Sequence, residues 1–265
     1  MKKGRFSVIT ITLNDVGGFV KTKASIDTQT FSDFQWIIVD GGSTDGTLEH
    51  LRRLDRPNCK WISQADEGLY DAMNKGLDLA TGEYVIFMNS GDRFTDQNVL
   101  HRVDALLGRN EEQADFIYGD AYEENANCKL LLKPARPVGA IRRGMFTHHQ
   151  AMFYARKAIG DMQYDRRFHV AADYHFTCRL LAKGACVVRA DFPICINGRG
   201  GLSENHARIG RRENLVIQKE ILRIGPSRLM LNYFSLMISA IMRASMRGLY
   251  DRIRFRQTDA VDEIR

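Results

Sequence analysis

Carboxylate side chains follow two short apolar runs of this 265-residue chain, where turn residues indicate that strands end. Asp40 comes after the run at 35–39 and opens the sequence Asp-Gly-Gly-Ser-Thr, and Asp92 closes the turn after the run at 84–88. A carboxylate at such a place can accept hydrogen bonds from a ribose or a base, or hold a divalent cation against a diphosphate. Each loop alone fits an ordinary capped turn. Two of them on successive strands favour a site for a nucleotide and a metal ion.

The first 120 residues alternate between strand and helix patterns. β-Branched and apolar runs predict strands at 6–13, 35–39, 60–63, 84–88 and 116–118. Helical spacing and capping residues predict helices that include 24–28, 44–53, 69–79 and 96–107. The residues at 14–18 indicate a turn after the first strand. This alternation predicts an α/β fold with a mostly parallel sheet flanked by helices, and a ligand site beyond the carboxyl ends of its strands.

Beyond residue 125 the pattern is less regular, and it changes again near residue 205. Strands are expected at 129–133, 151–154 and 185–189, and a helix at 171–182. From 205 onward the chain is predicted to be helical and basic, with eleven Lys or Arg against three acidic residues up to residue 256. We therefore expect a main domain over 1–205 and a helical extension over 206–265 that meets something anionic or apolar.

Composition narrows the class of protein further. The net charge of +6 permits an anionic partner without requiring one. The five cysteines form no C-x-x-C pair, so a disulfide framework and a zinc ribbon are disfavoured and a cytoplasmic location is expected. The basic N-terminus precedes a polar-interrupted strand pattern with no small-residue cleavage site, which disfavours secretion. Nucleic acid is disfavoured as a partner, because aromatic residues do not alternate with Lys and Arg.

Common nucleotide-binding motifs are absent from the sequence. A dinucleotide-binding fold needs G-x-G-x-x-G after its first strand, whereas this chain has Asn-Asp-Val-Gly-Gly at 14–18. The chain has neither the G-x-x-x-x-G-K-[ST] of a P-loop nor the G-x-S-x-G of a serine hydrolase.

Longer motifs resemble those of family 2 glycosyltransferases over about residues 5–205. They are Thr-Leu-Asn at 12–14, IVDGGSTDGT at 38–47, EGLYDAMNKGLDLATGEYVIFMNSGD at 67–92, HHQAMFYAR at 148–156, AADYHF at 171–176 and GGLS at 200–203. The block at 67–92 is specific, because packing and capping alone do not require its residue identities. The resemblance implies the nucleotide-diphosphosugar transferase fold called GT-A. More narrowly, the chain is similar to bacterial enzymes that build colanic acid, O-antigen and other surface polysaccharides.

The resemblance also implies roles for individual residues. Asp92 corresponds to the carboxylate of the D-x-D motif, which binds Mn²⁺ or Mg²⁺, and Asp173 corresponds to the catalytic base. His148 and Gln150 correspond to a pair on the acceptor side. Asp40 corresponds to the acid that binds the nucleotide base. The other positions implied on the donor side are Thr12, Asn14, Asp66, Asn74, Lys75 and Asn89.

Two positions depart from the family pattern. An aromatic residue often precedes the Asn of the first strand and stacks on the base, but this chain has Leu13. The metal motif has Asn89 and Gly91 where acids are common, which leaves one carboxylate; Mg²⁺ tolerates this because it keeps several waters. Without the resemblance, Asp173 is better explained as a helix cap, and the pair at 148–149 as part of a polar loop.

These residues fit a single displacement that inverts the anomeric centre. A cation at Asp92 offsets the charge on the leaving diphosphate, and Asp173 takes the proton of the attacking hydroxyl. The expected substrates are a nucleotide-diphosphosugar donor and a saccharide or polyprenol-linked acceptor. Two alternatives stay open. One is a sugar-nucleotide pyrophosphorylase, which is disfavoured because 14–18 carries no Lys or Arg, and the other is a non-catalytic polysaccharide-assembly module.

The C-terminal extension contains an apolar stretch with arginines on both sides. Between Arg228 and Arg243 lie 14 uncharged residues, fewer than the roughly 20 that cross a bilayer. Most of the helical surface there is apolar, and Asn232, Ser235 and Ser239 continue the stripe of the arginines. Such a helix fits either the inner membrane surface, lying in the plane of the interface, or a homodimer contact.

Overall fold

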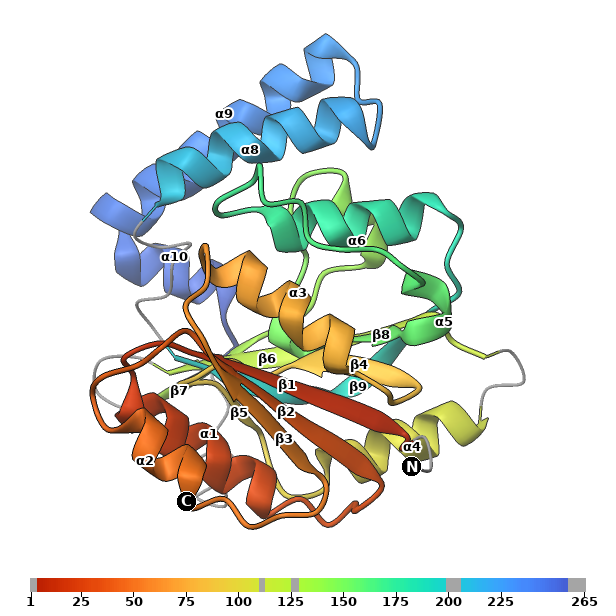
Figure 1. Ribbon diagram of the computed structural model, residues 1–265. Helices are drawn as coiled ribbons and strands as arrows, with labels where there is room; N and C mark the ends of the chain where they lie inside the picture. The colour runs from red at the N-terminus through yellow and green to blue at the C-terminus, as the bar shows by residue number, and fades with distance from the viewer. Residues whose placement is uncertain (1–3, 110–112, 125–128, 199–205, 257–265) are drawn as a thin grey trace.

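The computed structural model describes residues 4–109, 113–124, 129–198 and 206–256. Its centre is a nine-stranded sheet with helices on both faces, and a helical hairpin from the C-terminal part stands above one face (Figure 1). The strand order is β3-β2-β1-β4-β8-β6-β9-β5, and β7 pairs with β6 at the side.

The first half of the sheet is parallel, as the sequence predicts. It consists of β1 (Phe6–Thr12), β2 (Phe34–Asp40), β3 (Cys59–Ser63) and β4 (Tyr84–Phe87). Every residue of β1 and β4 is buried, which explains their continuous apolar runs. The register pairs Thr12 with Asp40 and Asp40 with Ser63, so three strands end side by side.

The second half of the sheet is mixed, and the prediction of a mostly parallel sheet therefore holds only for the first half. It consists of β5 (Arg93–Phe94), β6 (Phe116–Glu124), β7 (Leu130–Lys133), β8 (Met152–Ala155) and β9 (Val187–Asn197). Strand β8 runs antiparallel to both β4 and β6, whereas β6 and β9 are parallel. The chain reaches β8 through the short turns η1 (Val138–Ile141) and η2 (His149–Ala151) instead of the long helical crossover that a parallel strand needs.

Helices cover the sheet on both faces and divide the core in two. The helices α3 (Leu69–Leu79) and α6 (Ala172–Ala182) lie on one face, and α1 (Val16–Asp27), α2 (Thr47–Arg52) and α4 (Val99–Arg109) on the other (Figure 1). Tyr70, Met73 and Leu77 form the buried face of α3 at helical spacing. Gly76 lets this helix approach the sheet closely, because a Cβ there would lie 2.5 Å from Cγ2 of Ile9.

Helix α1 begins where the sequence predicts a turn. Asp15 is its N-cap, and its side chain accepts a hydrogen bond from the backbone N–H of Gly18 at 3.0 Å. The cap satisfies one of the free donors of the first turn, so the helix starts at Val16 in spite of two glycines. The sequence predicts a turn at 14–18, but Gly17 and Gly18 lie in the first turn of α1.

The C-terminal part forms α8 (Ala207–Glu220), α9 (Pro226–Ser245) and α10 (Arg247–Arg254), as its helical pattern predicts. Helices α8 and α9 pack side by side as a hairpin, and the chain then returns toward the sheet through α10 (Figure 1). The backbone N–H of Arg256 donates to the carbonyl oxygen of Leu132 in β7 at 2.9 Å. Within the described part of the chain, no helix combines the length and apolar character needed to span a membrane. Cys59, Cys178 and Cys195 are free thiols, and Cys128 lies outside the described residues.

Candidate active site

The loop after β2 is built around the carboxylate of Asp40, which is completely buried. Its oxygens accept hydrogen bonds from the backbone N–H groups of Gly42 and Ser43 and from the hydroxyl groups of Ser43 and Ser63. These bonds occupy the acceptor positions of the carboxylate. The structure therefore gives Asp40 the role of closing the loop, and contact with a nucleotide base stays a prediction.

Asn14 joins the ends of β1 and β2 at this edge of the sheet. It has a φ of 50°, and its side-chain oxygen accepts from the backbone N–H of Thr44 at 2.8 Å. Its own N–H donates to the hydroxyl of Ser43 at 2.7 Å. Next to it, the hydroxyl oxygen of Thr12 is buried without a hydrogen-bond partner. Thr12 and Asn14 thus lie at the carboxyl edge of the sheet, where the nucleotide-sugar donor is expected.

Asp66 lies at the rim of this edge and is half-buried. Its carboxylate covers Gly41, since a Cβ added to that glycine would lie 2.5 Å from Oδ2 of Asp66 and 3.2 Å from Cδ1 of Leu13. Leu13 is 52% exposed, so an apolar surface and a carboxylate stand side by side. This arrangement can receive a flat polar ring, with Leu13 in place of the aromatic residue that the family often has.

Asn74 and Lys75 hold the loops around α3. Both ends of the Asn74 amide bond the backbone of Tyr164, with the oxygen accepting from its N–H at 2.7 Å and the nitrogen donating to its carbonyl at 3.0 Å. Lys75 donates to the carbonyl of Ala65 at 3.0 Å and pairs with Asp71 at 3.0 Å. Through Ala65, Lys75 fixes the segment that carries Asp66. A contact of Asn74 and Lys75 with the nucleotide-sugar donor stays a prediction.

Asp92 is the buried carboxylate of the turn after β4. Its Oδ2 accepts from the side-chain amide of Gln150 at 2.7 Å, and its Oδ1 accepts from that of Asn197 at 2.9 Å and from the N–H of Gly198 at 3.3 Å. Burial raises the pKa of Asp92 to about 7, against the opposing effect of the Gln150 hydrogen bond. Neutral donors orient this group without neutralising its charge, so a cation beside it is favourable.

The surroundings of Asp92 fit a divalent cation. The side-chain oxygen of Asn89 is buried and has no hydrogen-bond partner. Carboxylate and amide oxygens are the ligands that Mg²⁺ and Mn²⁺ prefer. Asp15 adds a second negative charge nearby, because it accepts a hydrogen bond from the Ser90 hydroxyl at 2.8 Å and raises the pKa of Asp92. Among the described residues, no group of three or more acidic, His or Cys side chains could hold a metal ion.

Three consecutive residues at the start of η2 each face a different acidic group. His148 contacts Glu123 at 2.9 Å, His149 lies 3.8 Å from Asp173, and Gln150 donates to Asp92. Gln150, predicted on the acceptor side, therefore contacts the carboxylate of the proposed metal site. Its role toward the acceptor stays a prediction. The segment 148–150 places Asp92 and Asp173 on either side of one short turn.

Asp173 lies in the first turn of α6, and 22% of its side chain is exposed. The N-cap of α6 is Ala171, so the alternative of a simple helix cap does not apply to Asp173. Oδ1 of Asp173 accepts a hydrogen bond from the backbone N–H of Tyr174 at 2.7 Å and lies 3.5 Å from the hydroxyl of Tyr70. Burial raises the pKa of Asp173 to about 6, which places it in the range of a general base.

Helix α8 supplies the missing cap of α6. The carboxylate of Glu213 accepts hydrogen bonds from the backbone N–H groups of His169, Val170 and Ala171, at 2.8–2.9 Å. A carboxylate at this end also interacts favourably with the helix dipole. The C-terminal part of the chain therefore holds the helix that carries Asp173.

Several residues of this site escape prediction from the sequence. Asn197, at the end of β9, carries no motif that marks it. The sequence favours a polar loop for His149, whereas the structure buries it; burial lowers the pKa of His149 to about 3, so its ring is neutral. Glu123 and Lys133 form an ion pair beside His148. Burial acts to raise the pKa of Glu123, but His148 and Lys133 outweigh it and hold that pKa well below its usual range. The motif at 200–203 lies outside the described residues.

Comparison with known proteins identifies the family. The chain matches the model of glycosyl transferase family 2 over residues 7–186. It is 35% identical over 230 residues to the PGL/p-HBAD biosynthesis glycosyltransferase of Mycobacterium bovis, which covers 82% of each chain. It is 26% identical over 195 residues to the amylovoran biosynthesis glycosyltransferase AmsB of Erwinia amylovora, which covers 68% of this chain and 64% of AmsB.

Solved structures share the fold. TarS 1–349 of S. aureus in complex with UDP-GlcNAc superposes with a TM-score of 0.65 at 19% identity, over 90% of this chain and 73% of TarS. The mannosyltransferase PcManGT from Pyrobaculum calidifontis, in complex with GDP-Man and Mn²⁺, gives a TM-score of 0.64 at 17% identity, over 92% of this chain and 76% of PcManGT. The predicted α/β fold of GT-A type is therefore confirmed.

Fold and site together define a GT-A transferase. The chain belongs to glycosyltransferase family 2, and it is a glycosyltransferase. The two alternatives left open by the sequence, a pyrophosphorylase and a non-catalytic module, are thereby set aside.

Proposed function

We propose that the protein is an inverting, divalent-metal-dependent glycosyltransferase that moves a sugar from a nucleotide-diphosphosugar donor to a saccharide or lipid-linked saccharide. The observation that carries this proposal is the segment 148–150, which lies against Asp92 through Gln150 and against Asp173 through His149. An inverting displacement needs leaving-group stabilisation on one side of the sugar and a base on the other. Two carboxylates held on either side of one turn supply this arrangement.

Each residue has a defined part in this reaction. Asp92 and Asn89 would hold Mn²⁺ or Mg²⁺, which supplies Lewis-acid stabilisation of the departing diphosphate. Asp173 accepts the proton of the attacking hydroxyl, and its raised pKa suits a base that works near neutral pH. The neutral ring of His149 packs against Phe87 and lies 3.8 Å from the carboxylate of Asp173.

The donor is expected at the carboxyl edge of the parallel strands. Solved neighbours of the same fold bind UDP, UDP-GlcNAc and GDP-Man, which supports a nucleotide-diphosphosugar for this chain. We place the base between Leu13 and Asp66, because Asp40 is closed inside its own loop. The diphosphate then extends toward Asn89 and Asp92.

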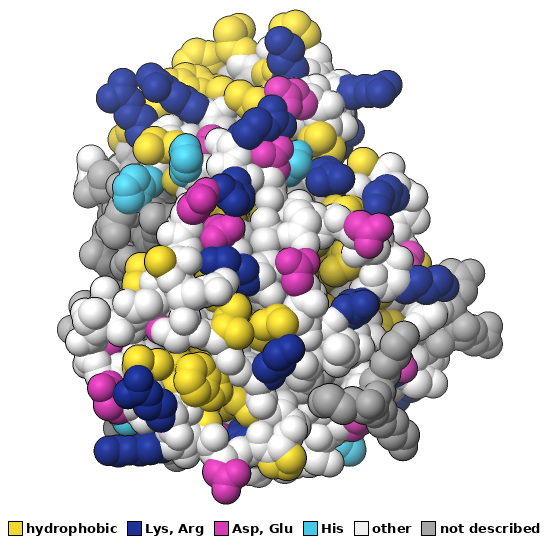
Figure 2. All heavy atoms as spheres, in the orientation of Figure 1, with side chains coloured by type: hydrophobic (Ala, Val, Ile, Leu, Met, Phe, Trp, Pro, Cys, Tyr) yellow, Lys and Arg dark blue, Asp and Glu magenta, His cyan; other side chains and the backbone are white. Residues whose placement is uncertain are grey.

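The acceptor belongs, in this proposal, to cell-surface glycan biosynthesis of the colanic acid or O-antigen kind. Relatives named for PGL/p-HBAD and amylovoran biosynthesis support a surface glycolipid or polysaccharide. The exposed apolar side chains of α9 support attachment of the extension 206–265 to the inner face of the membrane. They are Met230, Leu231, Tyr233, Phe234, Ile238 and Ile241. Apolar and basic side chains lie together over this part of the molecule (Figure 2). A homodimer through the same face is the alternative.

A donor screen followed by calorimetry tests the proposal. Melting curves with UDP-, GDP- and TDP-sugars plus Mn²⁺ identify the donor, because a ligand at 100 times its Kd adds about 2.7 kcal/mol. We expect the affinity for the matching nucleoside diphosphate to fall when EDTA is added, and Asp92→Asn to abolish this difference. Asp78→Asn, an exposed change on α3, is the matched control. Equal affinity with and without EDTA in the wild type excludes the metal role, and retention of anomeric configuration by NMR excludes inversion.

A further inference from the structure

The helix that carries Asp173 is held at its start by one side chain of α8. The carboxylate of Glu213 accepts hydrogen bonds at 2.8–2.9 Å from three consecutive backbone N–H groups, those of His169, Val170 and Ala171. Ala171 is the N-cap of α6, and Asp173 lies in the first turn of that helix. Hydrogen bonds to an ionised carboxylate are about twice as strong as those between neutral groups. A residue 42 positions from Ala171 therefore fixes the turn from which Asp173 extends.

The peptide group between Val170 and Ala171 is bonded on both of its sides. Its N–H donates to Glu213 at 2.8 Å, and its carbonyl accepts from the hydroxyl of Tyr70 in α3 at 2.7 Å. The same hydroxyl lies 3.5 Å from Oδ1 of Asp173. Rotation of this peptide group would break a bond to one of two other helices, so the group is fixed in direction. Glu213 is thus linked to Asp173 through one peptide group and one phenol.

Helix α8 approaches the start of α6 closely enough to bring Glu213 there. A Cβ added to Gly210 would lie 3.0 Å from Cγ1 of Val170, so the glycine permits this close approach. Ile217, about one turn after Glu213, is completely buried in the core on the face of the sheet that α6 covers. At helical spacing, Gly210, Glu213 and Ile217 share one side of α8.

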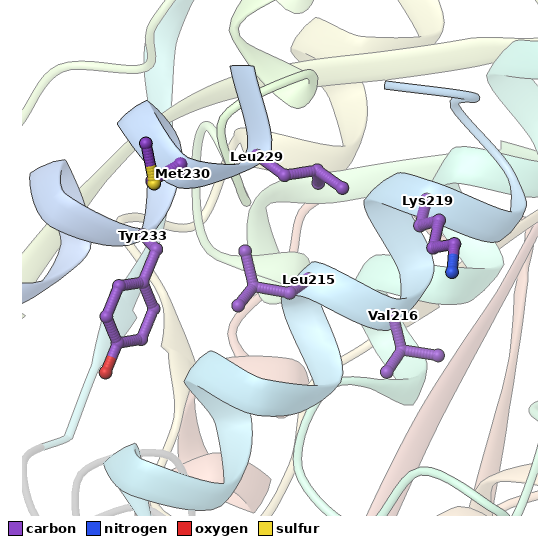
Figure 3. Close-up of a pocket in the computed structure, with 6 residues that line it drawn as sticks. All are labelled: Leu215, Val216, Lys219, Leu229, Met230 and Tyr233. Atoms are coloured by element: carbon purple, nitrogen blue, oxygen red, sulfur yellow. The ribbon is translucent and has the colours of Figure 1, made fainter. Parts of the chain in front are cut away.

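The opposite side of α8 faces α9 instead. Side chains of both helices line an apolar pocket of about 470 Å³ there: Leu215, Val216, Lys219, Leu229, Met230 and Tyr233 (Figure 3). Packing against α9 thus uses a different side of α8 from the one that carries Glu213. The backbone groups before α6 explain a glutamate at this position, whereas the hairpin does not require it.

Glu213 differs in charge from the other groups around Asp173. Among the described residues, the titratable groups that face Asp173 are Glu213 of α8, Tyr70 of α3, His149 of η2, Tyr154 of β8, Tyr164 ahead of α6 and Cys178 within α6. Burial raises the pKa of the phenols and of the thiol and lowers that of His149, so these groups are neutral at neutral pH. Glu213 brings a negative charge, which acts in the same direction as burial and raises the pKa of Asp173.

We propose that Glu213 is a positioning residue for sugar transfer, because it fixes the peptide groups before α6 and thereby the direction in which Asp173 presents its carboxylate to the attacking hydroxyl. This inference rests on the proposed function, in which Asp173 is the base. A misplacement of about 1 Å in a reacting group can cost about 100-fold in rate. A variant that loosens this turn should therefore lower turnover and leave the donor site at the edge of the sheet unchanged.

Glu213→Gln and Glu213→Asp in the full-length protein test this proposal. Glu213→Gln keeps the length of the side chain but removes its charge and one acceptor oxygen, whereas Glu213→Asp keeps the charge and shortens the side chain. Glu220→Gln is the matched control, because Glu220 is an exposed glutamate about two turns further along α8. Turnover is the release of nucleoside diphosphate from the donor found in the melting screen, with water as the acceptor. We expect it to fall by about tenfold or more in both Glu213 variants. Donor affinity, and turnover of the control, should stay within about twofold.

Two readouts separate positioning from a contribution to stability alone. In Asp173→Asn, the further change Glu213→Gln should alter turnover by about twofold or less, because both residues act through one carboxylate. In Glu213→Gln alone, the rise of turnover with pH should move to lower pH, since a charge that raises the pKa of Asp173 is removed. In Glu213→Asp, which keeps the charge, the rise should stay closer to that of the wild type. A purely structural role would lower the melting temperature and leave the pH profile unchanged.

The outcomes distinguish this inference from the proposed function. If Asp173→Asn is nearly inactive but both Glu213 variants keep turnover within about twofold, or if the loss from Glu213→Gln persists in full in Asp173→Asn, this inference alone is overturned. If Glu213→Gln does not fold, Glu213→Asp carries the same turnover and coupling measurements. Normal turnover in Asp173→Asn refutes the base of the proposed function instead.

A titration of the Asp173 carboxyl carbon by NMR covers the case in which no donor is turned over. That case refutes the proposed function, and the titration then tests the link between Glu213 and Asp173 by itself. A lower midpoint in Glu213→Gln than in the wild type and in Glu220→Gln supports the link. Equal midpoints in all three proteins overturn it.

Discussion

The side-chain amide of Gln150 donates to the carboxylate of Asp92 at 2.7 Å, across 58 positions of sequence. Asn197 donates to the other oxygen of the same carboxylate, so each oxygen has one amide partner. This pair of amides fixes the plane of the carboxylate before any ligand arrives. The residue before Gln150 in the chain, His149, lies beside Asp173, so orientation of Asp92 is linked to the surroundings of the proposed base.

Gln150→Leu is predicted to weaken metal-dependent nucleotide binding. Loss of a partner that orients a metal ligand typically costs 10–100-fold in metal affinity. Calorimetry of the nucleoside diphosphate with a Mn²⁺ series measures this. Gln163→Leu is the matched control, because Nε2 of Gln163 also donates to a carboxylate, that of Asp78, at 2.7 Å but on the surface. A raised acceptor KM with unchanged metal affinity would instead place Gln150 on the acceptor side.

Asp40→Asn and Asp66→Asn are predicted to have opposite effects on stability and donor binding. Asp40 accepts hydrogen bonds from N–H and hydroxyl groups of its own loop, so an amide NH₂ there faces donors and costs about 1–3 kcal/mol of stability. Asp66 is half-buried, so its variant should keep its melting temperature and lose about tenfold in nucleotide affinity. Melting curves and calorimetry on both variants decide between them. The reverse pattern would return the base contact to Asp40.

The parallel half of the fold could be predicted because its signals are local. Strand β1 and helix α3 follow from runs and spacings within a dozen residues, and the resemblance covers their loops. Strand β8 and the extension of β9 to Asn197 depend on pairing with strands far along the chain. Local periodicity carries no information about such partners. The sequence therefore predicts strands at 151–154 and 185–189 but neither the antiparallel pairing of β8 nor the full length of β9.

The site divides in the same way. Asp92 and Asp173 could be named from motifs, because each lies in a short segment with a recognisable pattern. The contact of Gln150 with Asp92, and the capping of α6 by Glu213, are tertiary contacts over more than 40 positions. Asp40 differs from both groups. A motif predicts that it binds the nucleotide base, but its carboxylate is buried and holds its own loop together.

Replacing the exposed apolar side chains of α9 is predicted to weaken membrane binding. Phe234 and Ile238 are 54% and 58% exposed, and full burial of such a side chain contributes about 1.5–3 kcal/mol. The double change to Ser should therefore lower binding to anionic vesicles by about tenfold or more in flotation. Val20→Ser, which removes an exposed apolar side chain from α1, is the control.

The double substitution tests membrane binding more specifically than removal of the chain from Gly225 onward. Truncation would also remove Asn232, which bonds Gln218 in α8 and the carbonyl of Arg142, and the pairing of Arg256 with β7. A wild-type protein that stays at the bottom of the gradient and forms a dimer, which the double variant splits, would favour the dimer interface.

Asp173→Asn is predicted to lower turnover by about 100-fold or more while donor affinity stays within about twofold. The amide keeps the size of the side chain but cannot take the proton of the acceptor at neutral pH. In the wild type, turnover should rise with pH through about 6 and level off above it, because the base acts in its ionised form and burial raises its pKa to about 6. Turnover rates measured from pH 5 to 8 for the wild type and Asp173→Asn check this rise with pH.

The stability of the wild type should fall over the pH range in which its activity rises. The folded-state pKa of Asp173 lies above the ordinary value of 3.8, so the folded protein holds this proton more tightly than the unfolded chain. The free energy of unfolding therefore falls as pH rises from about 4 to about 6, and Asp173→Asn should be more stable at pH 8 by up to about 3 kcal/mol. A variant that is more stable and nearly inactive identifies Asp173 as the base, whereas near-normal turnover would leave the inverting mechanism without its proton acceptor.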